Sequence, residues 1–129
     1  MEEKFKVTIV GILFNPSTRK ILVGKNKGDE KLSFVEGDLK YEEELDVGLK
    51  RVTKEKTGYI IHNLGAIFAK NKLKEMDTLQ IYFLCEATEG EETPSQDVEE
   101  LKWIKPTEVE NELGEKLPTR LREYILNLE

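Results

Sequence analysis

The chain has 129 residues, 36% of them charged and 38% apolar, which suits one domain with a single core under a heavily charged surface. Its formal net charge of −6 argues against a general affinity for nucleic-acid backbones or anionic lipid, although a local basic patch can still bind phosphate. No apolar run is long enough to cross a bilayer, and the opening residues MEEKFK lack the basic region and apolar core of a signal peptide. Cys85 is the only cysteine, so no intramolecular disulfide can form. We therefore expect a cytoplasmic protein without membrane attachment, folded as one domain over residues 1–129.

A hairpin and a further short strand are predicted in the first part of the chain. Apolar residues alternate and then run together over residues 5–14, which predicts a strand. Residues 15–17 (Asn-Pro-Ser) form a turn, and residues 20–25 (KILVGK) return as the second strand. After a polar stretch, residues 32–35 predict a short third strand that leads into Gly37.

An amphipathic helix is predicted over residues 44–57. Leu45, Leu49 and Val52 recur at the i, i+4 and i+7 spacing of one helix face. Gly58 follows directly, and glycine is the usual residue at a helix C-terminal cap. The helix should therefore pack this apolar stripe on the sheet.

The second half of the chain predicts three more strands and two helices. The segments are strands over residues 59–69, 78–87 and 98–104, a polar connection over 70–77, an exposed mobile loop over 89–97, a short helix from Pro106 and Thr107, and a helix over 117–128. Strands before, between and after the helices indicate an α+β fold, an α/β/α sandwich with a mixed β-sheet.

One stretch carries a recognisable spacing of glycines, acids and an arginine. These residues are Gly37, Glu43, Arg51, Glu55 and Gly58, followed by the large apolar Tyr59. The 23 residues from Gly37 to Tyr59, GDLKYEEELDVGLKRVTKEKTGY, resemble the signature of the Nudix hydrolases. The order of strands and helices is similar to that of Nudix domains over the whole chain. The resemblance implies a Nudix-like α/β/α sandwich.

The same stretch departs from the family pattern at positions that carry the family's metal chemistry. Residues 52, 55 and 56 share one face of a helix, and the family places carboxylates there to hold Mg²⁺ or Mn²⁺ against a substrate pyrophosphate. Here they are Val52, Glu55 and Lys56, with a formal charge of zero instead of −3. Binding of the metal cofactor should therefore be weak or absent, with Glu55 as the remaining ligand and Glu43 as its partner.

The resemblance also assigns roles to individual residues. Glu55 stands at a catalytic position, while Arg51 and Glu43 support the geometry of the loop and helix. The ligand-binding residues are expected to be Gly37, Lys56, Lys25 and Lys27, with the Lys56 ammonium group meeting a ligand phosphate in place of the cation. A residual metal site or catalytic base can also come from acids that are otherwise ordinary solvated surface: Glu42, Glu44, Glu86, Glu89, Glu91 and Glu92.

Other catalytic chemistry has little support in the sequence. His62 is the only histidine, which precludes a site with several histidine ligands. Cys85 lies in an apolar strand and Trp103 in the last strand, so both are expected to belong to the core.

Three functions remain open. The first is a Nudix-fold domain that binds a nucleoside diphosphate-linked or related phosphorylated small molecule, with metal-dependent pyrophosphohydrolase activity weak or lost. The second is an active Nudix pyrophosphohydrolase with a non-standard acidic metal site. The third is a non-catalytic protein-interaction scaffold. Nudix domains are often dimers, so a homodimer is compatible with each function.

Overall fold

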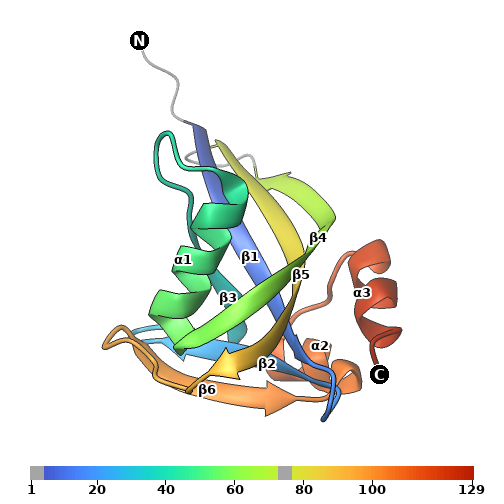
Figure 1. Ribbon diagram of the computed structural model, residues 1–129. Coiled ribbons are helices and arrows are strands. Elements are labelled where there is room, and N and C mark those ends of the chain that lie inside the picture. The colour runs from blue at the N-terminus through green and yellow to red at the C-terminus, as the bar shows by residue number, and fades with distance from the viewer. Residues whose placement is uncertain (1–4, 73–76) are drawn as a thin grey trace.

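A six-stranded mixed sheet forms the centre of the protein, with helices on both of its faces (Figure 1). The structure, a computed structural model, describes residues 5–72 and 77–129. Its elements are β1 (Phe5–Asn15), β2 (Lys20–Asn26), β3 (Ser33–Asp38), α1 (Leu45–Thr57), β4 (Tyr59–Lys72), β5 (Asp77–Gly90), β6 (Val98–Ile104), the 3₁₀ turn η1 (Pro106–Glu108), α2 (Val109–Leu113) and α3 (Thr119–Leu126). The predicted α+β class with a mixed sheet is confirmed.

The strand order is β4-β5-β1-β3-β2-β6, and β1 also pairs with β2. The long pairing between β1 and β5 is parallel and extends from Phe5 opposite Asp77 to Phe14 opposite Glu86. The other pairings are antiparallel. In the described part of the chain β2 pairs with β3 only at Phe34 and Ser33, so no described strand covers this edge of β3 from residue 35 onwards, which we call the open edge. That open edge becomes one wall of the site.

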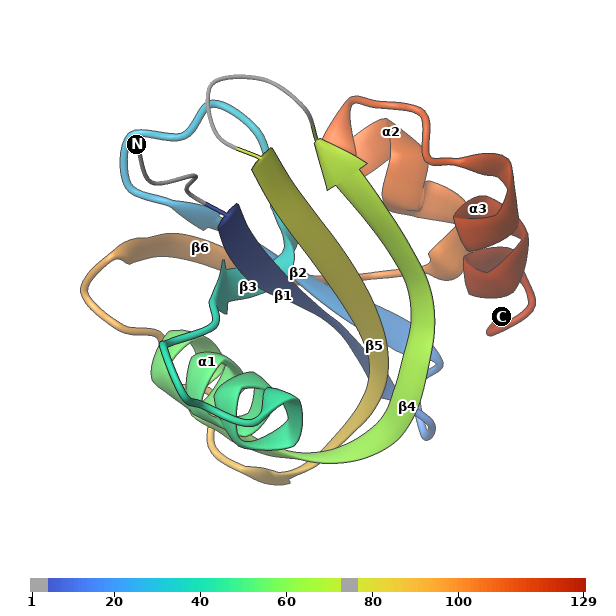
Figure 2. The same cartoon turned by 90° about the horizontal axis from the view of Figure 1, so that it is seen from above.

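Two apolar layers cover the two faces of the sheet. In the view from above, α1 lies against one face and α2 and α3 lie against the other (Figure 2). The side chains of β1 contribute alternately to the two layers, because successive side chains of a strand point to opposite faces of the sheet. Ile9 and Leu13 pack with Leu49 of α1 on one face. Val10 and Ile12 pack on the other face with apolar side chains of α2 and α3.

The helix α1 has the predicted position and the predicted end. Gly58 adopts a left-handed conformation with φ 84°, and its N–H donates to the carbonyl oxygen of Lys54. Leu49 and Val52 are buried, but Leu45 is 39% exposed, so its predicted place in the packed stripe is wrong. The first turn approaches the sheet through Gly48, where an added Cβ would lie 2.9 Å from the Ile9 side chain.

Several other boundaries differ from the predictions. β3 continues to Asp38, so Gly37 lies in a strand rather than a loop, because it pairs with Ile9 of β1. β4 and β5 lengthen into the predicted connection over 70–77, of which residues 73–76 lie outside the described part. The predicted helix over 117–128 covers only 119–126, and it follows Pro118, which lacks a backbone N–H. No described helix is long and apolar enough to span a membrane.

The segment after β5 is exposed, but it is fastened to the end of α1. The Thr93 N–H donates to the carbonyl oxygen of Thr57 at 2.8 Å. Gly58 and Gly90 meet so closely that a Cβ at Gly90 would lie 2.7 Å from the Gly58 carbonyl oxygen. The loop that was predicted over 89–97 therefore begins at residue 91, because residues 89 and 90 still belong to β5.

Candidate functional site

A cleft of about 680 Å³ lies where α1 meets the ends of β1, β3 and β5. Gly37, Val52 and Glu55 line it from the side of α1, and Thr8 and Gln80 line it from the sheet. Thr8 and Gln80 occupy the sheet face that carries Val10 and Tyr82, whereas Gly37 faces α1. The cleft therefore passes around the open edge of β3 and joins the two faces of the sheet.

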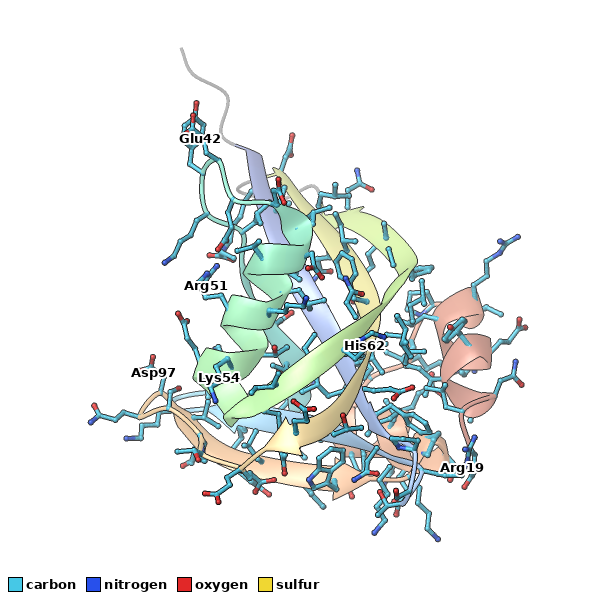
Figure 3. The ribbon with its side chains drawn as sticks, viewed as in Figure 1. Arg19, Glu42, Arg51, Lys54, His62 and Asp97 are labelled. Atoms are coloured by element: carbon cyan, nitrogen blue, oxygen red, sulfur yellow. The ribbon has the colours of Figure 1, made fainter. Side chains whose placement is uncertain are left out.

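An ion pair between Glu43 and Arg51 fixes the loop in front of α1. Arg51 Nε donates to Glu43 Oε2 at 2.8 Å, and Nη2 donates to Oε1 at 2.9 Å. Nη2 also donates to the carbonyl oxygen of Asp38 at 2.8 Å, and Glu43 Oε1 accepts from the Lys40 N–H at 3.0 Å. Arg51 accordingly projects from α1 towards the segment that links β3 to the helix (Figure 3).

This pairing determines the charge state of Glu43. The hydrogen bond from Arg51 is the largest cause that lowers the pKa of Glu43, followed by the Lys40 backbone N–H, and the value falls to about 2. The same ion pair raises the pKa of Arg51. Both oxygens of Glu43 are already used by protein donors, so its role here is to hold the loop against the helix.

Gly37 and Val52 form the contact between β3 and α1. Val52 is only 3% exposed, and a Cβ at Gly37 would lie 2.9 Å from each of its methyl groups. The backbone of Gly37 does not have a positive φ, so the close approach of Val52 is what requires a glycine here.

Glu55 and Lys56 occupy the last turns of α1 at the mouth of the cleft. The Glu55 side chain is 59% exposed, and its Oε2 lies 3.5 Å from Arg51 Nη1. Lys56 is half-buried, and its Nζ donates to Asn26 Oδ1 on β2 at 3.2 Å. The ammonium group of Lys56 thus bridges the helix and the end of β2.

A family model described as the NUDIX domain matches residues 4–127. The chain belongs to the Nudix family. No curated protein sequence matches it. Its fold is similar to a NUDIX hydrolase from Nitrosomonas europaea (TM-score 0.81, 17% identity, covering 97% of this chain and 72% of that one). It is also similar to the MutT protein from Methanosarcina mazei Go1 (TM-score 0.74, 18% identity, covering 99% and 95%) and to a UDP-X diphosphatase (TM-score 0.75, 12% identity, covering 99% and 62%).

The residues of this Nudix site do not fit the divalent metal that the family generally uses. Position 52 is a buried valine, position 56 is a lysine, and the oxygens of Glu43 are engaged by Arg51 and Lys40. Of the expected ligands, only the Glu55 carboxylate remains open to solvent. Across residues 5–72 and 77–129, no three acidic, histidine or cysteine side chains come together in a way that could hold a metal ion.

The additional acids suggested by the sequence lie elsewhere. Glu42 stands at the tip of the loop before α1 (Figure 3). Glu92 Oε1 accepts hydrogen bonds from Tyr59 Oη at 3.3 Å and from Trp103 Nε1 at 3.2 Å. None of the suggested acids is among the residues that line the cleft: Glu42, Glu44, Glu86, Glu89, Glu91 and Glu92.

Two of the expected ligand-binding residues, Lys25 and Lys27, do not line the cleft either. Lys25 pairs with Glu99 at 3.2 Å and lines a separate hollow of about 20 Å³, which it shares with Lys56. Lys27 is exposed on the turn after β2, where its N–H donates to the Asp97 carbonyl oxygen. Of the lysines proposed to bind ligand, Lys56 alone lines the cleft among the described residues.

The remaining candidates are structural or exposed. Cys85 is fully buried, and burial raises the pKa of its thiol to about 12. Trp103 is half-buried and contacts Tyr59 edge to face, with ring centroids 5.9 Å apart. His62 is exposed on β4 (Figure 3).

The polar residues at the sheet end of the cleft were not predicted from the sequence. Lys6 Nζ pairs with Asp38 Oδ2 at 3.2 Å, and Thr8 Oγ1 donates to Asp38 Oδ1 at 3.5 Å. Gln80 is 7% exposed, and its Oε1 has no hydrogen-bond partner in the described part of the chain. A polar residue between Leu79 and Ile81, within the otherwise apolar run over residues 79–85, was the available signal.

Proposed function

We propose that this Nudix domain binds a nucleoside diphosphate-linked or related phosphorylated small molecule in the cleft, and that its metal-dependent pyrophosphohydrolase activity is weak or lost. The observation that carries the proposal is that two acidic positions of the family signature are occupied by the buried Val52 and the cationic Lys56. The cleft has the volume and the cationic groups for phosphate, and among the described residues no three acidic, histidine or cysteine side chains come together to hold a metal ion.

Phosphate binding rests on cations that line the cleft on several elements. Lys6, Lys40, Arg51 and Lys56 contribute side chains to it. Arg51 is already held by Glu43 and Lys6 by Asp38, so the ammonium groups of Lys40 and Lys56 are better placed to receive an anion. Lysine supplies charge and hydrogen bonds without Lewis acidity, so it supports binding without activating a phosphorus atom for attack.

Calorimetric titration with ADP and with inorganic pyrophosphate, in EDTA and in Mg²⁺, tests this proposal. Binding in EDTA is expected, and Lys56→Met should weaken it tenfold or more, since a hydrogen bond to a charged group contributes about 1.5–3 kcal/mol and about 1.4 kcal/mol is a factor of ten. Lys50→Met is the matched control: it removes the same charge from α1, but Lys50 pairs with Asp46 and does not line the cleft. Absence of binding in EDTA, or equal effects of the two substitutions, would contradict the proposal.

An active hydrolase is the second candidate, because Glu55 lines the cleft with an exposed carboxylate. In that case Mn²⁺ should raise the melting temperature by several degrees, and the protein should release phosphate from nucleoside diphosphate derivatives. Both effects should disappear in Glu55→Gln. Binding that requires the metal and is lost in Glu55→Gln would favour this second function over the first.

A further inference from the structure

β4 is an edge strand with the composition of a central strand. It ends the order of the sheet, and no described strand pairs with its outer side. It overlaps the longest run of the chain without Asp, Glu, Lys or Arg, residues 57–69, although 36% of the chain is charged. The other long uncharged run, residues 7–18, contains most of β1, which has neighbours on both sides. Edge strands of soluble proteins usually carry charges that oppose pairing with another chain, and β4 lacks them over this run.

The opposite edge of the sheet is protected in the usual way. Of the seven residues of β6, three are charged: Glu99, Glu100 and Lys102. On β4, by contrast, Ile60 is 51% exposed and Leu64 is 46% exposed. Leu64 is also skipped in the pairing with β5, because it lies at a bulge. β4 therefore presents an uncharged strip in which backbone groups and apolar side chains lie uncovered by any described strand.

The bulges of β4 restrict what can pair with this strip. The register with β5 shifts at three places between Ile60 and Phe68. Bulges increase the local twist of a strand and interrupt its ladder, so a regular strand of another protein fits this edge poorly. A second copy of β4 carries the same bulges and the same twist. The irregularity of the edge therefore favours a second copy of this chain as its partner.

The charges near the two ends of β4 favour an antiparallel pair of copies. Glu86 of β5 lies beside His62 in the first part of β4, and Lys70 lies near the end of β4. Glu86 and Lys70 occupy the face of the sheet that carries Tyr82, since Lys70 Nζ lies 5.9 Å from the centre of the Tyr82 ring. Ala66 is midway between His62 and Lys70. A two-fold axis at Ala66 therefore places the partner's Lys70 opposite His62 and next to Glu86.

We propose that β4 pairs antiparallel with β4 of a second copy about a two-fold axis near Ala66, so that the two sheets become one. None of the residues of β4 lines the cleft, so this interface is independent of the proposed function. β4 has 14 residues, and a pairing over about ten of them is about 34 Å long. Such a narrow strip buries less than the about 800 Å² per partner of a standard interface, so the dimer should dissociate on dilution.

Sedimentation velocity from micromolar to near-millimolar concentration tests the pairing. The wild type should change from monomer to dimer over this range and form nothing larger, because a two-fold contact closes. Ala66 is exposed, and Ala66→Lys or Ala66→Glu places like charges opposite each other at the axis. Each variant alone should need about fivefold more protein to dimerise, or more. Val47→Lys is the matched control, because Val47 is 53% exposed on α1, and it should leave the dimerisation unchanged.

An equimolar mixture of Ala66→Lys and Ala66→Glu distinguishes a lost contact from a damaged fold. Opposite charges then face each other at the axis, so the mixture should dimerise at least as well as the wild type. A mixture that stays monomeric, although each variant melts at the temperature of the wild type, overturns the antiparallel pairing near Ala66. A wild type that is monomeric at every concentration, or a dimer that Val47→Lys weakens as much as the Ala66 variants do, overturns the assignment of the interface to β4. Growth beyond the dimer overturns the two-fold arrangement.

Discussion

Replacing Gly37 with alanine should destabilise the fold through one contact. The new Cβ would lie 2.9 Å from both Val52 methyl groups, about 0.6 Å or more inside the usual carbon–carbon separation. Overpacking of this kind costs about 1–3 kcal/mol, and alanine recovers about 0.5–1 kcal/mol over glycine in a strand. We expect Gly37→Ala to lower the free energy of unfolding by about 1–2 kcal/mol.

The double variant Gly37→Ala/Val52→Ala should be more stable than the two single variants imply. Val52→Ala alone removes two buried methyl groups and should cost about 2 kcal/mol. In the double variant, the methyl group introduced at position 37 occupies space that the valine has left. The destabilisation should therefore be at least about 1 kcal/mol smaller than the sum, well beyond the scatter of independent sites.

Urea unfolding followed by the fluorescence of Trp103 measures these differences, provided that the slopes of the transitions agree. Val47→Ala is the control for Val52→Ala, because Val47 also lies on α1 but is 53% exposed. Its effect should be small and should add to that of Gly37→Ala. A Gly37→Ala protein as stable as the wild type, or strict additivity with Val52→Ala, would show that this contact does not determine the glycine.

Three further outcomes follow from the site and the core. Val52→Glu together with Lys56→Glu should raise metal binding and pyrophosphatase activity. Mn²⁺ at a hundred times its dissociation constant should raise the free energy of unfolding of this double variant by about 2.7 kcal/mol, and equal activity of the wild type would contradict the prediction. The pKa of Glu43 falls from its usual 4.5 to about 2 on folding, so the associated stability is present above pH 4.5 and is lost as the pH falls towards 2. Melting temperatures of Glu43→Gln should therefore depend less on pH in that window, and an unchanged slope would refute the pairing with Arg51. Burial raises the pKa of Cys85 to about 12, so a thiol reagent at pH 8 should react with it only after unfolding, which absorbance can follow.

The helix α1 could be predicted because the sequence pattern that determines it is local. The end of α1 at Gly58 and the burial of Leu49 follow from spacing within one helix. The exposure of Leu45 did not follow, because it depends on how the first turn meets the sheet through Gly48. The periodicity of apolar residues indicates which face of a helix is apolar, but it does not indicate how much of that face packs against the sheet.

The residues at the sheet end of the cleft could not be predicted, because their positions depend on strand pairings that no local sequence pattern encodes. Gln80 faces the cleft beside Thr8 only because β5 pairs with β1 in one particular parallel register. Lys25 was expected to bind a ligand, but its side chain forms an ion pair with Glu99 on the neighbouring strand β6. The register of the pairing between β2 and β6 shifts between Lys25 and Asn26. A shift of one residue in a strand exchanges the faces on which its side chains lie.

The parallel pairing of β1 with β5 also bears on how the chain folds. It joins residues 5–14 to residues 77–86, so the central strand acquires its second neighbour only after most of the chain has been synthesised. Until then β1 can pair with β2 and β3, which leaves one apolar edge open to association with other chains. Folds that depend on such distant pairings cross their barrier slowly. The arrival of β5 therefore gives β1 its second neighbour and closes that edge.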